Sequence, residues 1–123
     1  MKKIIVIIPA YCEEATIHAT VQAVKAVKTP LSKMDCNLFV YVINDGSQDA
    51  TAEKAQAASA DRILHHRVNQ GLGSAVRTGL QAAMRDEADI AVKFDADLQH
   101  DPQDILSVIK PILDDEAEVV YGN

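Results

Sequence analysis

The run Ile4-Ile5-Val6-Ile7-Ile8 decides the fold class of this 123-residue chain. Five consecutive β-branched apolar residues predict a strand that is covered on both faces, as the central strands of parallel sheets are. Further short apolar runs follow at 38–43, 62–64, 90–94 and 119–121, separated by segments of helical periodicity. This alternation predicts an α/β fold with a mostly parallel twisted sheet flanked by helices.

The segments between the predicted strands carry helix signals. A first helix is expected from Ile17 and should end before Pro30, because proline breaks a helix interior. Asp49 can cap a short helix that runs to about residue 58, and a further helix is expected over 72–83. Asp101-Pro102 is a strong helix start, with a capping side chain followed by proline at the first helical position.

Composition and charge restrict the classes of function. A chain of this length with 48% hydrophobic residues is one domain with a real core. The net charge of −6 and the absence of a dense Lys/Arg cluster argue against nucleic-acid binding.

Cys12 and Cys36 form no metal-ligand pattern and are expected to be free thiols. No segment approaches the ~20 apolar residues that span a bilayer.

Polar segments follow each of the first four predicted strands. They lie at 9–14, 44–49, 67–73 and 95–101. Ligands of open parallel sheets bind at the carboxyl ends of the strands, near the point where the strand order reverses. Because all four segments fall on that edge, the sequence predicts a single ligand site there.

The segment after the fourth strand carries the strongest chemical signal. Asp95 and Asp97 are two residues apart, so on an extended backbone their carboxylates point to the same side. Two facing carboxylates repel each other unless a cation lies between them. A divalent cation that also coordinates phosphate oxygens fits such a site best. Gln99 continues the alternation with a neutral oxygen ligand. The alternative is a solvated loop with helix-capping acids, which an isolated Asp-x-Asp favours.

The other polar motifs each have a structural and a functional interpretation. Asn44-Asp45-Gly46-Ser47 is either a plain turn or a ligand loop in which Asp45 accepts a hydrogen bond from a base or a ribose. Gly71-Leu72-Gly73 lacks the third glycine of a dinucleotide fingerprint and predicts a tight helix entry instead. A haloacid dehalogenase-type phosphatase is rejected, because its Asp-x-Asp follows the first strand. The histidines have no metal-ligand spacing and are expected to be solvated or in loops: His18, His65, His66 and His100.

Four segments together resemble family 2 glycosyltransferases, most closely the polyprenyl-phosphate sugar transferases of the dolichyl-phosphate mannose synthase type. The segments are 8–14 (Ile-Pro-Ala-Tyr-Cys-Glu-Glu), 42–49 (Val-Ile-Asn-Asp-Gly-Ser-Gln-Asp), 69–75 (Asn-Gln-Gly-Leu-Gly-Ser-Ala) and 95–100 (Asp-Ala-Asp-Leu-Gln-His). They occur in the family's order and spacing over nearly the whole chain. The resemblance implies a Rossmann-like nucleotide-diphospho-sugar transferase fold of the GT-A type.

The resemblance also implies a function and a set of site residues. The activity would be metal-dependent, inverting transfer of a sugar from a UDP- or GDP-linked donor to an acceptor, with a polyprenyl phosphate expected. The implied contacts to the donor are Pro9, Tyr11, Glu13, Ile43, Asp45, Asp95, Ala96 and Asp97. Mg²⁺ or Mn²⁺ would be held by Asp95, Asp97 and Gln99, and the two aspartates would serve catalysis.

Two departures from the family pattern refine the expectation. Cys12 stands where the family usually has asparagine. The chain ends at Asn123, where the family continues into a Gly-x-Arg segment and an acceptor-binding half. We therefore expect 1–123 to be the donor-binding part of a truncated transferase domain, cytoplasmic and peripheral to a membrane in the full-length protein, with its cut sheet edge open to homo-oligomerisation.

Three alternatives stay open at this point. The chain could be a non-catalytic nucleotide-sugar or metal-binding fragment, or the acceptor could be a saccharide. Nucleotidyltransferases of related fold are disfavoured, because a Gly-rich phosphate loop should follow the first strand where Pro9-Ala10-Tyr11 lies instead.

Overall fold

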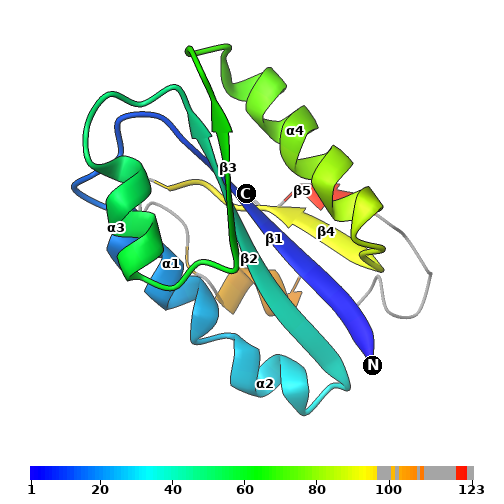
Figure 1. Cartoon of the computed structure of the whole chain (residues 1–123). Coiled ribbons are helices and arrows are strands. Elements are labelled where there is room, and N and C mark those ends of the chain that lie inside the picture. The colour runs from blue at the N-terminus through cyan, green and yellow to red at the C-terminus, as the bar shows by residue number, and fades with distance from the viewer. Residues whose placement is uncertain (97–100, 102, 108, 110–118, 122–123) are drawn as a thin grey trace.

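A parallel sheet with helices on both faces forms the body of the molecule (Figure 1). The computed structural model describes residues 1–96, 101, 103–107, 109 and 119–121. Its strands are β1 (Lys2–Ala10), β2 (Cys36–Asp45), β3 (Arg62–His66), β4 (Ile90–Lys93) and β5 (Val119–Tyr121). Its helices are α1 (Ile17–Lys25), α2 (Lys28–Ser32), α3 (Thr51–Ala57) and α4 (Leu72–Arg85), and residues 103–107 are also helical. The sheet order is β3-β2-β1-β4-β5 with parallel pairing throughout, which confirms the predicted fold class.

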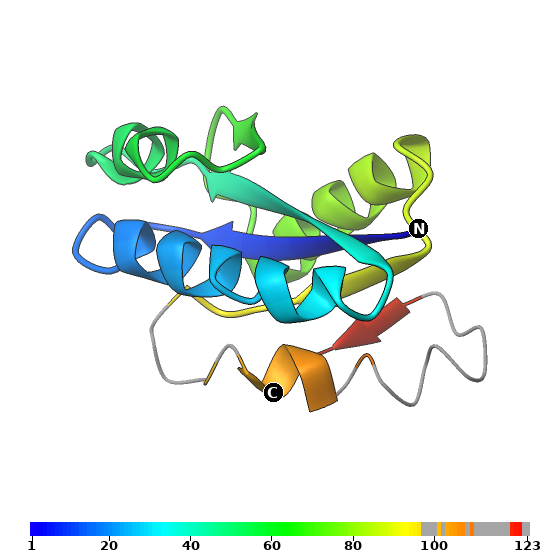
Figure 2. The ribbon, with the colours of Figure 1, turned by 90° about the horizontal axis from the view of Figure 1, so that it is seen from below.

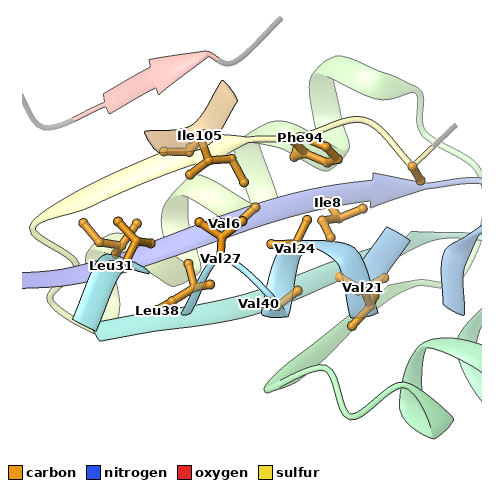
Figure 3. Packing of buried hydrophobic residues seen from close by; sticks show 14 of the residues in the cluster. Val6, Ile8, Val21, Val24, Val27, Leu31, Leu38, Val40, Phe94 and Ile105 are labelled. Carbon is orange, nitrogen blue, oxygen red and sulfur yellow. The ribbon is translucent and has the colours of Figure 1, made fainter. Parts of the chain in front are cut away.

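The central strand β1 is buried on both faces, as its composition predicts. Ile4, Val6 and Ile8 point into a cluster with residues of α1, α2 and α3 (Figure 3). Ile5 and Ile7 point to the opposite face and pack against α4. Alternate residues of one strand therefore anchor helices on two sides of the sheet, which is why the run carries no polar position.

Gly79 sets the distance between α4 and β1. A Cβ at this position would lie 2.4 Å from Cγ2 of the fully buried Ile7. We expect Gly79→Ala to lower the free energy of unfolding by about 1–3 kcal/mol, because the overlap outweighs the gain in helix propensity.

A matched control lies in the same helix. A Cβ on Gly73 would meet nothing within 4 Å, so Gly73→Ala should stabilise the protein by up to about 1 kcal/mol through helix propensity alone. Urea denaturation of both variants measures the difference. Equal stability of the two variants would mean that α4 does not pack on β1 as described.

The first helix ends before Pro30, as predicted, because α1 stops at Lys25. The sequence did not predict the second short helix, α2, which contains Pro30. Proline is tolerated there because it occupies the first turn, where backbone N–H groups have no intrahelical partner.

Asp101 caps as expected, since its Oδ1 accepts the backbone N–H of Gln103 at 2.9 Å. Asp49 accepts the backbone N–H of Thr51 at 3.0 Å, but it lies one residue before the N-cap position of α3, which Ala50 occupies.

Both cysteines are free thiols, Cys36 buried and Cys12 exposed, which confirms the prediction from the sequence. Within the described ranges, no helix has the length and apolar character needed to cross a membrane.

The strand order reverses between β1 and β4. The connection from β1 leads to β2 on one side, and β4 and β5 lie on the other. Because the strands are parallel, the loops after β1 and β4 leave the sheet at the same edge (Figure 2). A crevice at such a switch point is where open α/β sheets bind ligands.

Candidate functional site

A pocket of about 360 Å³ opens at the switch point, beside the carboxyl ends of the strands. We call it the strand-end pocket. It is lined by Pro9, Ala10, Tyr11, Glu13, Asp45, Asn69, Gly71, Leu72, Ala75, Asp95 and Ala96. The carboxyl ends of β1 and β2 and the loops after β1, β3 and β4 thus meet in one place.

The loop after β1 is tied to the loop after β2. The backbone N–H of Cys12 donates to Oγ of Ser47 at 2.9 Å, and that of Glu13 donates to Oγ1 of Thr51 at 2.9 Å. Cys12 itself has a φ of 54°, in the left-handed region that asparagine tolerates better than most residues. The family's usual asparagine therefore has a conformational reason at this position, apart from any polar contact.

Asp45, at the end of β2, is held by four hydrogen bonds. Its Oδ1 accepts from Nδ1 of His66 at 2.7 Å and from the backbone N–H of Gln70 at 3.0 Å. Its Oδ2 accepts from Nδ2 of Asn69 at 3.0 Å and from the backbone N–H of Gly71 at 2.9 Å. The carboxylate is 3% exposed, and it joins the end of β2 to the turn that begins α4.

These contacts keep Asp45 ionised. Burial acts to raise its pKa, but the hydrogen bonds from Gln70, His66 and Gly71 outweigh burial and hold the pKa of Asp45 below its usual range. A negative charge is therefore fixed at the wall of the strand-end pocket.

His66 corrects a prediction from the sequence. The histidines were expected to be solvated or in loops, yet the His66 side chain lies in β3 with only 8% of its surface exposed. Its Nδ1 faces Asp45, and its Nε2 lies 2.7 Å from Oγ1 of Thr78 on α4. Because a carboxylate only accepts hydrogen bonds, Nδ1 must carry the proton. His65, the preceding residue, is exposed as expected.

Gly46 allows the loops after β2 and β3 to touch. Its φ is +75°, and a Cβ there would lie 2.3 Å from the backbone nitrogen of Asn69 and 2.4 Å from the carbonyl carbon of Val68. Only glycine fits both the conformation and the space. This close approach places Asn69 and the residues after it against Asp45.

The loop after β4 is fastened to α1. The carbonyl oxygen of Ala96 accepts hydrogen bonds from the hydroxyls of Thr16 at 2.6 Å and Thr20 at 3.1 Å. Asp95, one residue earlier, has its Oδ1 2.9 Å from Nζ of Lys93. These contacts fix the direction in which the acidic loop leaves the sheet.

The structure brings together most of the predicted contact residues. Those that line the strand-end pocket are Pro9, Tyr11, Glu13, Asp45, Asp95 and Ala96. Ile43 is fully buried in the core beneath α4 and is not among the lining residues. Asp97 and Gln99 lie outside the described residues.

Some residues of this site were not predicted from the sequence. Asn69 and His66 both contact Asp45 from the third-strand region, and Thr16 and Thr20 hold the acidic loop. The two threonines lie four residues apart on one helical face, a spacing that suggests a shared partner but does not name it. No sequence signal separates His66 from its exposed neighbour His65.

The chemistry at Asp95 suits a hard divalent cation. Its carboxylate oxygens are the kind of ligand that Mg²⁺ and Mn²⁺ take, and Glu13 places a second carboxyl group on the pocket wall. In the part of the chain that the structure describes, no group of three or more His, Cys, Asp or Glu side chains is arranged to hold an ion. The predicted partners of Asp95 are Asp97 and Gln99, which lie in the segment that is not described.

Two curated relatives match nearly the whole of this chain. An uncharacterised protein of Methanocaldococcus jannaschii is 33% identical over 98% of this chain and 46% of its own length. A UDP-N-acetylglucosamine–dolichyl-phosphate N-acetylglucosaminyltransferase of Methanococcus voltae is 34% identical over 99% of this chain and 52% of its own length. The chain thus spans about half the length of the curated relatives it matches.

A solved structure supports the same relationship. Glucosyl-3-phosphoglycerate synthase of Mycobacterium tuberculosis, in complex with Mn²⁺, UDP-glucose and phosphoglyceric acid, superposes with a TM-score of 0.72 and 27% identity. The superposition covers 91% of this chain and 39% of that enzyme. The model of the family described as "Glycosyl transferase family 2" matches residues 5–123. By the extent of that match, this chain belongs to glycosyl transferase family 2.

Proposed function

We propose that residues 1–123 form the donor-binding part of an inverting, metal-dependent glycosyltransferase. The observation that carries the proposal is the strand-end pocket, where carboxylates from the loops after β1 and β4 and from the end of β2 meet at the switch point of a parallel sheet. Membership of family 2 and the UDP-sugar and Mn²⁺ bound by the related mycobacterial enzyme support it. The donor is a nucleoside diphosphate sugar, and the support favours a UDP-sugar over a GDP-sugar.

The residues of the pocket divide into two groups. Pro9, Tyr11, Glu13 and Asp45 would contact the nucleoside, since they lie at or just after the carboxyl ends of β1 and β2. Asp95 and Ala96 would face the sugar and diphosphate, together with Asp97 and Gln99 from the segment that is not described. Ile43 would support this wall from the core rather than touch the donor.

The chemistry requires charge stabilisation on the leaving group. A bound Mg²⁺ or Mn²⁺ would supply it by neutralising the negative charge on the nucleoside diphosphate. Asp95 would hold that ion, and the bonds from Thr16 and Thr20 to Ala96 would keep the loop in position without rearrangement. Lys93 balances the charge of Asp95 at 2.9 Å.

The acceptor is proposed to carry a phosphate. The name of the Methanococcus voltae relative specifies dolichyl phosphate, and the mycobacterial structure contains phosphoglyceric acid. A polyprenyl phosphate is already an anion, so its attack on the anomeric carbon would need no strong general base. Such an acceptor would place the full-length protein at a membrane surface. A saccharide acceptor and a non-catalytic binding fragment are the alternatives.

Calorimetric titration tests the donor site. UDP, UDP-GlcNAc, UDP-glucose and GDP-mannose should each be titrated with and without Mn²⁺. We expect UDP and at least one UDP-sugar to bind, with an affinity that Mn²⁺ raises at least tenfold. Asp95→Asn should remove most of that Mn²⁺ effect, because an amide is a poor ligand for a hard cation. Absence of Mn²⁺-dependent binding for the whole panel would refute the proposed function.

A matched variant isolates the role of the Asp95 carboxylate. Lys93→Met removes the ammonium 2.9 Å from Asp95 but leaves the carboxylate itself. The Mn²⁺ effect should therefore persist or increase in Lys93→Met. If Lys93→Met loses the Mn²⁺ effect as Asp95→Asn does, the ion pair and not the carboxylate would be the cause.

A further inference from the structure

The Asp45 carboxylate has no acceptor position left for a ligand. A carboxylate offers about four lone-pair sites, and protein donors fill two on each oxygen of Asp45. Yet Asp45 lines the strand-end pocket and, under the proposed function, accepts a hydrogen bond from the nucleoside. One of the four protein donors must then leave when the nucleotide binds.

Three of the four donors are fixed by their surroundings. The donors from Gln70 and Gly71 are backbone N–H groups in the turn that starts α4. His66 is held from its other side by Thr78, and its ring is almost completely buried between β3 and α4. Moving any of these groups would disturb the junction between the sheet and α4.

The fourth donor, Asn69, is placed differently. Asn69 is exposed, lines the strand-end pocket, and reaches Asp45 with a flexible side-chain amide. The same Nδ2 lies 3.3 Å from the backbone carbonyl oxygen of Asp45, a longer and weaker contact. Its removal would expose Oδ2 of Asp45 toward the pocket.

We infer that nucleotide binding at Asp45 is an exchange, in which an N–H or O–H group of the nucleoside replaces the side-chain amide of Asn69. This inference rests on the proposed function. Asn69 is then a residue that tunes affinity by competing with the ligand, and His66 is the positioning residue that keeps the carboxylate in place during the exchange. Nucleotides that present a donor at this point gain the bond, and those without one leave Asn69 on Asp45.

The exchange predicts that truncating Asn69, a pocket residue, raises the affinity for UDP instead of lowering it. Truncating a residue that contacts a ligand weakens binding, whereas truncating a competitor strengthens it. Asn69→Ala frees Oδ2 of Asp45, so we expect the affinity for UDP with Mg²⁺ to rise about three- to tenfold, the value of one net hydrogen bond. Val68→Ala is the matched control, because that side chain is the adjacent one and is 66% exposed. Its affinity should stay within about twofold of the original chain.

A second measurement does not depend on the variant's folding. In ¹H–¹⁵N spectra of the unsubstituted chain, the side-chain amide signals of Asn69 should move toward solvent-exposed values as UDP and Mg²⁺ are added. His66 should keep its Nδ1–H tautomer throughout the same titration.

The outcomes separate the two proposals. Unchanged or weaker UDP binding by Asn69→Ala, or amide signals of Asn69 that do not respond to bound UDP, would overturn the exchange and leave the donor site intact. Failure of the unsubstituted chain to bind UDP at all would refute the proposed function and the exchange with it.

Discussion

Asp45→Asn is expected to lower the free energy of unfolding by about 2–4 kcal/mol and to weaken UDP binding at least tenfold. Asparagine matches aspartate in shape, but its amide nitrogen would face two of the four groups that donate to Asp45. Each buried donor left without an acceptor costs about 1–3 kcal/mol. Denaturation in urea at pH 7 and calorimetry with UDP measure the two effects.

Asp89→Asn provides the control for this prediction. Asp89 is exposed at the amino-terminal edge of the sheet and accepts one hydrogen bond, from the backbone N–H of Lys3. Because asparagine can also accept that bond, its stability should change by no more than about 0.5 kcal/mol. Similar losses for Asp45→Asn and Asp89→Asn would contradict the hydrogen-bonding role assigned to Asp45.

The effect of Asp45→Asn on stability should also depend on pH. The folded-state pKa of Asp45 is lowered, so its contribution to stability is fully present above its unfolded pKa of about 3.9. That contribution is lost as the pH falls through the lower folded value. The stability difference between the original chain and Asp45→Asn should therefore shrink as the pH falls below about 4. A difference that grows as the pH falls below about 4 would have the wrong sign.

Gly46→Ala is expected to have an effect of similar size, about 3 kcal/mol or more, by another route. A methyl group would overlap the backbone at Val68 and Asn69, which would have to move by roughly 1 Å to restore van der Waals contact. The positive φ of Gly46 adds strain. The shift would also carry the donors at Gln70 and Gly71 away from Asp45, so UDP binding should weaken together with stability.

Gln48→Ala is the matched substitution in the same loop. Gln48 is exposed, so truncation there should change stability by no more than about 0.5 kcal/mol and leave UDP affinity unchanged. Thermal denaturation and calorimetry on the two variants provide the comparison. A Gly46→Ala protein as stable as Gln48→Ala would show that the loops after β2 and β3 do not meet as closely as described.

The architecture could be predicted because its signals are local. Five β-branched residues in a row at 4–8 can be satisfied only by a strand that is covered on both faces, and the structure buries all of them. The Asp101-Pro102 pair likewise indicates a helix start within two residues. The short helix α2 was not predicted, because a proline signal does not distinguish a helix end from the first turn of a new helix.

The site could be predicted only in outline. The sequence places Tyr11, Asp45 and Asp95 on one sheet edge, because the parallel topology fixes where each strand ends. It cannot show that His66 turns inward while His65 is exposed, since that depends on which face of the edge strand β3 meets α4. Nor can it show that Asn69 reaches Asp45, because that contact follows from the close approach at Gly46.

The central claim is that a metal-bound nucleotide occupies the strand-end pocket, and paramagnetic line broadening tests it most directly. ¹H–¹⁵N spectra of the chain should be compared with UDP and Mg²⁺ and with UDP and Mn²⁺. We predict that Mn²⁺ selectively broadens the amide signals of Tyr11, Asp95 and Ala96, which line the pocket. The signals of Lys2 and Asp89, at the opposite edge of the sheet, should stay sharp. Uniform broadening, or sharp signals at Asp95 and Ala96, would contradict the claim.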